Sequence, residues 1–101
     1  MENSPFWLTE ADVTSLIDLN GAIAALESTL KDEARGLAES MPKTHLMVDA
    51  HNAMHAIGGV LQREGICGTK TWVNIDGKSA TLLIVYSLED GSCRAVIEAT
   101  A

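Results

Sequence analysis

Residues 65–74, GICGTKTWVN, decide the fold of the C-terminal half, because they form a β-prone segment with a single charge. The charge is Lys70, which follows a Gly-Ile-Cys-Gly lead-in and shares the segment with Asn74. An unpaired ammonium costs free energy when it faces a packed layer. We therefore expect Lys70 either at the rim of a sheet or against an anion.

Turn signals divide the rest of this half into strands. The Asp-Gly pair within residues 75–78 predicts a hairpin, and Glu-Asp-Gly at residues 89–91 predicts a second one. Residues 81–88 between them read TLLIVYSL and are apolar on both faces, which predicts a central strand that is covered on both sides. The last strand is expected over residues 93–98.

The N-terminal half has the pattern of a short strand followed by two helices. Residues 6–8 read as the strand, and Thr9 is a helix N-cap with Asp12 in the first turn. The first helix is expected to end near residues 17–18. The second is expected over residues 20–39, and the two central leucines of its apolar stripe should be buried against the sheet. The stripe consists of Ile23, Leu26, Leu30, Ala34 and Leu37.

At Lys43 the sequence changes from a helical to a strand period. A strand is expected from there to a turn at residues 51–52, followed by a return strand over residues 53–59 and a loose helical turn over residues 60–64. The order is then a short strand, two helices and an antiparallel β-meander packed on the helices. This order predicts one α+β domain over residues 1–101.

Charge and composition restrict the function. The 101 residues carry a net charge of −7 at pH 7 and no basic cluster, which argues against nucleic-acid binding. No apolar run is long enough to span a membrane and no cationic signal peptide precedes Pro5, so we expect a cytoplasmic protein. Cys67 and Cys93 are expected to be buried free thiols, with a disulfide between them left open.

These features together resemble the N-terminal domain of the ornithine cyclodeaminase/mu-crystallin family. In that family a Gly-x-Lys strand is followed by a strand, an Asp/Glu-x-Gly hairpin and a final strand of pattern xAxIE/D-A, as in residues 65–100 here. The opening FWLTEADV at residues 6–13, the helix GAIAALESTL at residues 21–30, and Met54 extend the resemblance. It implies NAD(P)-linked chemistry on a small amino, imino or keto acid, and dimerisation through the sheet of this domain.

The resemblance also implies a substrate-binding set of Lys70, Lys43 and Asn74. The family lysine at the position of Lys70 contacts the substrate carboxylate, which suits a compact, rotatable ammonium. The family pattern Pro-x-Arg is replaced here by Pro42-Lys43-Thr44, and Lys43 supplies a charge but no bidentate fork. No catalytic residue is assigned.

A second departure concerns the acidic residue of the cyclodeaminase branch, which lies two positions before the family methionine. Asn52 occupies that position here, and an amide is no general base. Reductase or dehydrogenase chemistry is therefore favoured over ornithine cyclisation.

The family's second domain, which holds the dinucleotide, is expected to be missing. No G-x-G-x-x-G occurs in the chain, and it ends where the connecting helix of the family should begin. We expect no cofactor-binding residues here, although NAD(P) is implied for a full-length relative. Two hypotheses remain: a substrate-binding and dimerisation domain that is inactive alone, or a stand-alone, non-catalytic homodimeric binding module that has kept the fold.

Three histidines raise the question of a metal site. Across a hairpin near His51, the side chains of His45 and His55 are expected to approach each other, and Asp49 is placed to join them. Their spacing matches no strong metal-binding pattern, so rim positions are favoured and no metal ligand is assigned.

Overall fold

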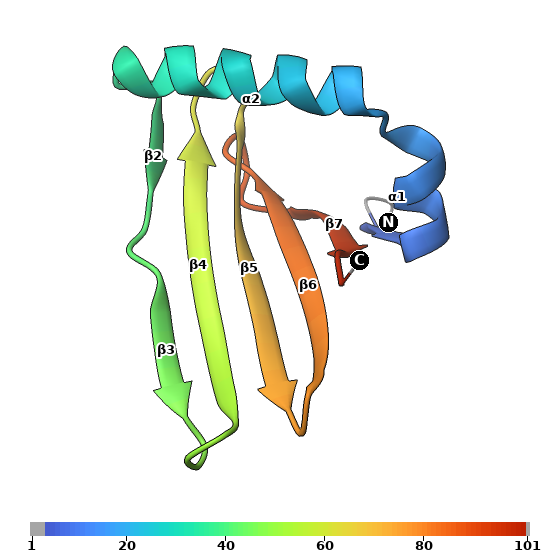
Figure 1. Cartoon of the computed structure of the whole chain (residues 1–101). Coiled ribbons are helices and arrows are strands. Elements are labelled where there is room, and N and C mark those ends of the chain that lie inside the picture. The colour runs from blue at the N-terminus through green and yellow to red at the C-terminus, as the bar shows by residue number, and fades with distance from the viewer. Residues whose placement is uncertain (1–3, 101) are drawn as a thin grey trace.

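The computed structural model describes residues 4–100, which form an α+β domain with two helices and a mixed seven-stranded sheet (Figure 1). The predicted fold class is therefore confirmed. In chain order the elements are β1 (Phe6–Leu8), α1 (Glu10–Leu16), α2 (Leu19–Ala34), β2 (Ala38–Ser40), β3 (Thr44–Met47), β4 (Ala53–Leu61), β5 (Ile66–Ile75), β6 (Lys78–Ser87) and β7 (Cys93–Glu98).

The sheet has the order β1-β7-β6-β5-β4-β2, and β3 also pairs with β4. The strands from β2 to β7 are antiparallel to their neighbours, as the predicted meander requires. The N-terminal strand β1 adds one parallel pair by joining the outer edge of β7. Both β2 and β3 pair with β4, one after the other along its length (Figure 1).

The helix starts follow the sequence signals. Thr9 and Asp12 form a reciprocal capping box at α1, in which the Thr9 hydroxyl accepts from the Asp12 amide and the Asp12 carboxylate accepts from the Thr9 amide. Asp18 caps α2 and accepts a hydrogen bond of 2.7 Å from the Gly21 amide. Both helix N-termini are thus closed by carboxylates.

The end of the second helix was placed too late by the sequence. Helix α2 ends at Ala34, and Gly36 adopts a left-handed φ of 75°. The Leu37 amide then donates 2.8 Å to the Asp32 carbonyl, which closes the helix in the manner of a glycine C-terminal cap. Residues 38–40 therefore form β2, and β4 extends to Leu61 where a loose helical turn was expected.

An ion pair between a buried aspartate and a half-exposed arginine fixes α2 to the sheet. Asp32 is 4% exposed, and its carboxylate accepts a hydrogen bond of 2.8 Å from Nε of Arg63, in the turn between β4 and β5. The same guanidinium donates to the Ser28 hydroxyl at 2.6 Å. These contacts hold the C-terminal half of α2 across one end of the sheet (Figure 1).

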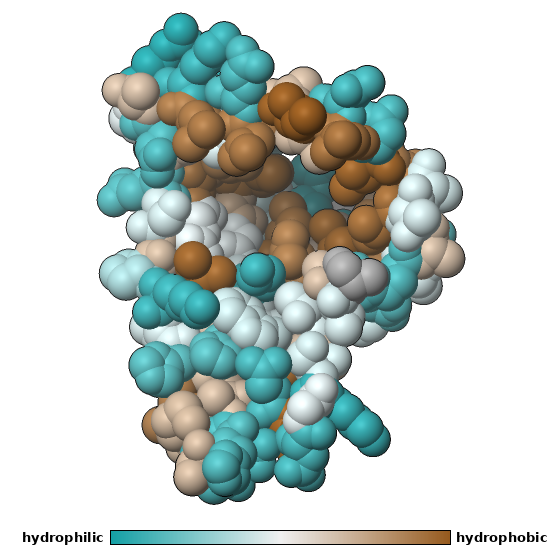
Figure 2. All heavy atoms as spheres, in the orientation of Figure 1, coloured by the Kyte–Doolittle hydropathy of each residue, from teal (hydrophilic) through white to brown (hydrophobic). Residues whose placement is uncertain are grey.

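The predicted burial of the helix stripe is wrong for this chain. Leu26 and Leu30 are 61% and 55% exposed, and Ile23 is similarly open. The reason is geometric, because α2 crosses the end of the sheet and packs mainly on β2. Figure 2 shows the resulting hollow, with hydrophobic side chains gathered beneath the helix.

Strand β6 lies between β5 and β7, so its predicted central position is confirmed. Its predicted cover on both faces is not found, because Leu82 to Val85 are only half-buried. Within residues 4–100, the buried apolar side chains are the small ones of Ala38 and Ala53, each 8% exposed. No helix in this part of the chain is long and apolar enough to span a membrane.

Candidate ligand-binding site

Two of the three residues predicted to bind substrate, Lys70 and Asn74, lie on one face of β5, as strand geometry requires. Alternate residues of β5 point to one face of the sheet, which brings Lys70, Trp72 and Asn74 to the same side. The register places His55 of β4 opposite Trp72, and His45 of β3 opposite His55. The rings of Trp72, His55 and His45 therefore lie in a row across three adjacent strands, on the face that carries Lys70.

The rings in this row are in contact. His55 stacks on Trp72 with ring centroids 4.9 Å apart and an interplanar angle of 12°. His45 is tilted against His55 with centroids 6.0 Å apart, which confirms the predicted approach of these two side chains. Nδ2 of Asn74 lies 3.5 Å from Nε2 of His55. Nδ1 of His55 is buried and has no hydrogen-bond partner among the described residues.

Two ammonium groups flank the Trp72 ring. Nζ of Lys70 lies 4.8 Å from the ring centroid, and Nζ of Lys43 lies 5.2 Å from it. Within residues 4–100, neither ammonium lies within ion-pair distance of a carboxylate. In a chain with a net charge of −7, this face therefore holds two unneutralised cations.

Magnitudes show that these cations are available to a ligand. A cation–π contact at an exposed site is worth about 0.5–1 kcal/mol. A hydrogen bond between charged partners contributes about 1.5–3 kcal/mol. A charged hydrogen bond to either ammonium would therefore outweigh its contact with the Trp72 ring. The arrangement is suited to binding an anion, with Asn74 able to donate from its amide.

The turn residues near the site have structural roles. Asp49 does not join the histidines; its carboxylate accepts from the His51 and Asn52 amides at 2.8 and 2.9 Å. These hydrogen bonds lower the pKa of Asp49 below its usual value of 3.8. The hydrogen bond from the His51 amide contributes most to this shift. Within residues 4–100, no three His, Cys, Asp or Glu side chains are grouped to hold a metal ion.

Asn52 joins two hairpins. Its Oδ1 accepts a hydrogen bond of 2.8 Å from the Asp76 amide, and its Nδ2 donates 2.9 Å to Asp49. The hairpin at Asp76-Gly77 has the expected left-handed pair, with φ values of 51° and 76°. Asn52 therefore positions the turns beside the site. Its side-chain amide does this because it both donates a hydrogen bond to one turn and accepts one from the other.

Trp72 and His55 are the site residues that sequence reasoning did not select. The signal for Trp72 was its position two residues after Lys70, which puts both side chains on one face of a strand. His55 was considered only as a metal ligand. Its ring instead packs on Trp72 and contributes to the surface on which the two ammonium groups lie.

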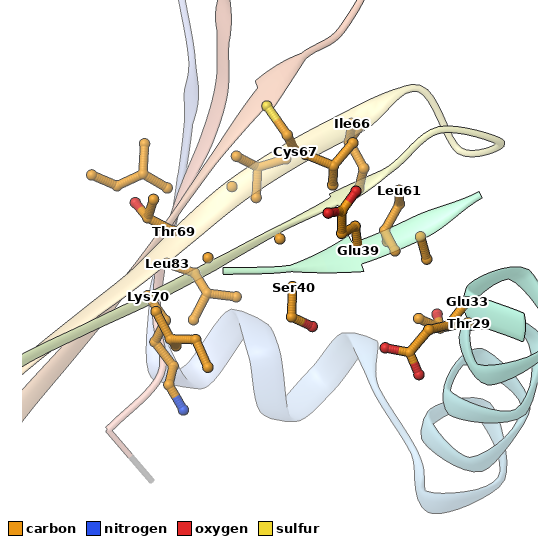
Figure 3. Close-up of a pocket in the computed structure, with 18 residues that line it drawn as sticks. Thr29, Glu33, Glu39, Ser40, Leu61, Ile66, Cys67, Thr69, Lys70 and Leu83 are labelled. Carbon is orange, nitrogen blue, oxygen red and sulfur yellow. The ribbon is translucent and has the colours of Figure 1, made fainter. Parts of the chain in front are cut away.

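A hollow adjoins the cationic pair. It has a volume of about 350 Å³ and lies between α2 and the face of the sheet that carries Lys70 (Figure 3). Ile57, Leu61, Leu83 and Val85 are among the apolar residues around it. Lys70 belongs to the same lining, so this one residue is shared by the hollow and the cationic pair.

In comparison with solved structures, the fold matches part of proteins described as a probable ornithine cyclodeaminase, an alanine dehydrogenase and two reductases with bound NAD+ or NADH. No protein-family model matches the chain, and no curated protein sequence matches it. The resemblance inferred from the sequence is confirmed by these structures.

Three of the matching structures illustrate the similarity. A probable ornithine cyclodeaminase from Bordetella pertussis Tohama I matches 94% of this chain at 19% identity, with a TM-score of 0.86. An archaeal alanine dehydrogenase dimer with bound NAD matches 95% at 29% identity, with a TM-score of 0.84. The Thermococcus litoralis Δ1-pyrroline-2-carboxylate reductase, in complex with NADH and L-proline, matches 92% at 16% identity, with a TM-score of 0.83.

The match covers only part of each of these proteins. The chain corresponds to 30%, 31% and 31% of their respective lengths. It therefore spans about a third of the proteins that it resembles.

Proposed function

We propose that this chain is the substrate-binding and dimerisation domain of an ornithine cyclodeaminase/mu-crystallin-like, NAD(P)-dependent protein. Its substrate is a small amino, imino or keto acid, whose carboxylate is bound by Lys70 and Lys43 with Asn74 as a further donor. The observation that supports this most is the convergence of the two lysines on Trp72, with no described carboxylate to neutralise them. The L-proline complex of the Thermococcus litoralis reductase also supports a carboxylate-bearing ligand.

The described residues do not fit a dinucleotide, so no step through NAD(P) is derived. Pyrophosphate groups bind where free backbone amides open a helix N-terminus. The N-termini of α1 and α2 are instead occupied by the carboxylates of Asp12 and Asp18, which would repel a phosphate. We propose that this chain alone binds no NAD(P)H, whereas a full-length relative would. Saturable micromolar binding in an NADH fluorescence titration would contradict this.

Homodimerisation is the second half of the proposal. Leu46 and Met54 are register partners on the face of the sheet opposite Lys70, and they are 68% and 52% exposed. Exposed apolar surface on a small domain is typical of a protein interface, and twofold symmetry is its commonest form. The archaeal alanine dehydrogenase, which is described as a dimer, supports this proposal.

A stand-alone homodimeric binding module remains the second candidate function. Asn52 favours it, because this side chain serves the hairpins and supplies no base. The module would retain the carboxylate site but take no part in catalysis.

The carboxylate site is tested by NMR titration with a small 2-oxo acid at fixed ionic strength. The amide signals of Lys70, Lys43 and Asn74 and the indole signal of Trp72 should shift. Lys70→Ala should abolish the response, because the point charge supplies much of the attraction for the anion. Lys78→Ala, at the start of β6, is the matched control and should respond like wild type. Equal shifts in wild type and Lys70→Ala would contradict the proposed site.

A further inference from the structure

Part of the floor of the hollow beneath α2 carries no side chains. Gly59 of β4 and Gly68 of β5 are register partners at its centre, on the face that carries Lys70. The next row toward Trp72 is Ile57, Lys70 and Leu83, on three adjacent strands. The glycine pair thus leaves an open space in the row next to Lys70, while the Lys70 ammonium lies on the other side, over Trp72.

Close neighbours make these glycines necessary. A Cβ atom at Gly68 would lie 2.5 Å from the carbonyl oxygen of Ile84, and one at Gly59 would lie 3.2 Å from that of Glu39. A side chain at Gly68 would therefore force the backbones of β5 and β6 apart, and one at Gly59 would require the neighbouring backbone to move by a few tenths of an ångström. The gap in the floor follows from the close approach of neighbouring strand backbones at Gly59 and Gly68. It is therefore a fixed feature of the paired sheet.

The two ends of the hollow carry side chains of opposite charge. Lys70 is its one cation among the described residues, and Glu33 of α2 lies at the opposite end from it (Figure 3). Between them the lining is mainly aliphatic, with Ile57, Leu83 and Val85 on the sheet. The space suits a ligand with an anionic head and an apolar body, and a second anionic group would approach Glu33.

We propose that the hollow receives the side chain of the ligand, so that the site selects carboxylic acids with an aliphatic chain over short or dicarboxylic ones. This inference rests on the proposed function and names its substrate class. The carboxylate is held by Lys43 and Lys70 at Trp72, and the chain extends over the Gly59–Gly68 floor beneath α2. A terminal carboxylate is disfavoured because it would lose its hydration among aliphatic groups and meet Glu33.

The size of the effect follows from apolar burial. A fully buried methylene improves affinity about fourfold, and one in a hollow open to solvent improves it less, about twofold. Each added methylene should therefore tighten binding about twofold to fourfold until the chain fills the space. The volume of about 350 Å³ is at the lower end of the range typical of small-molecule sites, roughly 300–1,000 Å³.

The test is a series of straight-chain 2-oxo acids: pyruvate, 2-oxobutanoate, 2-oxopentanoate and 2-oxohexanoate, with 2-oxoglutarate as the dicarboxylate of matched length. Dissociation constants are measured by NMR at pH 7 and fixed ionic strength. We expect a gain of roughly tenfold or more from pyruvate to 2-oxohexanoate. The methyl signals of Ile57 and Leu83 should shift with the long acids and not with pyruvate. 2-Oxoglutarate should bind at least tenfold more weakly than 2-oxopentanoate.

A filled hollow provides the control. Leu83→Phe enlarges a side chain that lines it, and this variant should lose the gain in affinity from pyruvate to 2-oxohexanoate. Leu82→Phe places the same ring on the opposite face of β6 and should keep the gain.

The outcomes separate the two proposals. Equal affinities along the wild-type series, or tighter binding of 2-oxoglutarate, would overturn the inference while leaving the carboxylate site standing. An equal series is also expected if a second copy of the chain fills the hollow in solution. Failure of every acid to bind would overturn the proposed function itself, and the inference with it.

Discussion

Trp72 is the residue on which the candidate site depends, because side chains from three other positions are arranged around its ring. His55 stacks on it, and the ammonium groups of Lys43 and Lys70 lie about 5 Å from its centroid. The family resemblance selected the lysines and Asn74 from sequence. It did not select Trp72, because an aromatic residue in a strand is as readily a core residue as a platform for cations.

At the same scale, the pKa of Asp49 gives a prediction for acid conditions. The carboxylate is stabilised in the folded state by amide hydrogen bonds from His51 and Asn52, so its folded pKa is below the ordinary 3.8. A group with a lowered folded pKa contributes stability above its unfolded pKa and loses it as pH falls through the folded pKa. Below about pH 4, the protection of the His51 and Asn52 amides against hydrogen exchange, relative to their intrinsic rates at the same pH, should therefore decrease.

Asp49→Asn supplies the comparison for this prediction. The variant keeps one acceptor oxygen and has no charge to titrate, so its hairpin should show no additional loosening in acid. An NMR titration that places the Asp49 midpoint above 3.8 would contradict the assigned hydrogen bonds.

At the scale of elements, α2 shows where periodicity misleads. A helical stripe predicts which face of a helix is apolar, but it contains no information on what that face meets. Here Gly36 ends the helix and the Asp32–Arg63 pair fixes it across the end of the sheet. Much of the stripe is therefore left exposed. The strands were predicted more accurately, because turn residues at both hairpins set their limits locally.

The exposed stripe changes the expected effect of truncating it. Leu26→Ala would cost about 2–5 kcal/mol if the side chain were buried. With 61% of Leu26 exposed, the free energy of unfolding of the monomer should fall by less than about 1 kcal/mol. Urea denaturation at low protein concentration measures this. A loss of 2 kcal/mol or more would show that the helix packs more deeply than described here.

At the scale of the whole molecule, the domain leaves much apolar surface open. The exposed side chains include those of α2 on one face of the sheet and Leu46 and Met54 on the other. A stable dimer buries about 800 Å² per partner.

The parallel pair between β1 and β7 was not predicted, because it joins segments from the two ends of the chain and no local sequence pattern indicates it.

We expect a homodimer by sedimentation at tens of micromolar, formed through the face of Leu46 and Met54. Met54→Glu should shift the species toward monomer, because it places a charge in the interface. Met47→Glu, on the opposite face of the same pair of strands, is the control and should remain dimeric. A wild-type monomer at this concentration would contradict the proposed assembly.

The central claim is that Lys43 and Lys70 act together on one anion above Trp72. The most direct measurement is the dissociation constant of a single 2-oxo acid for wild type, Lys43→Gln, Lys70→Gln and Lys78→Gln, at equal pH and ionic strength. Because a charged hydrogen bond is worth about 1.5–3 kcal/mol, removing either Lys43 or Lys70 should weaken binding about tenfold or more, and Lys78→Gln should leave it unchanged. If Lys43→Gln bound as tightly as wild type, or if all three variants lost affinity equally, the two lysines would not form the site.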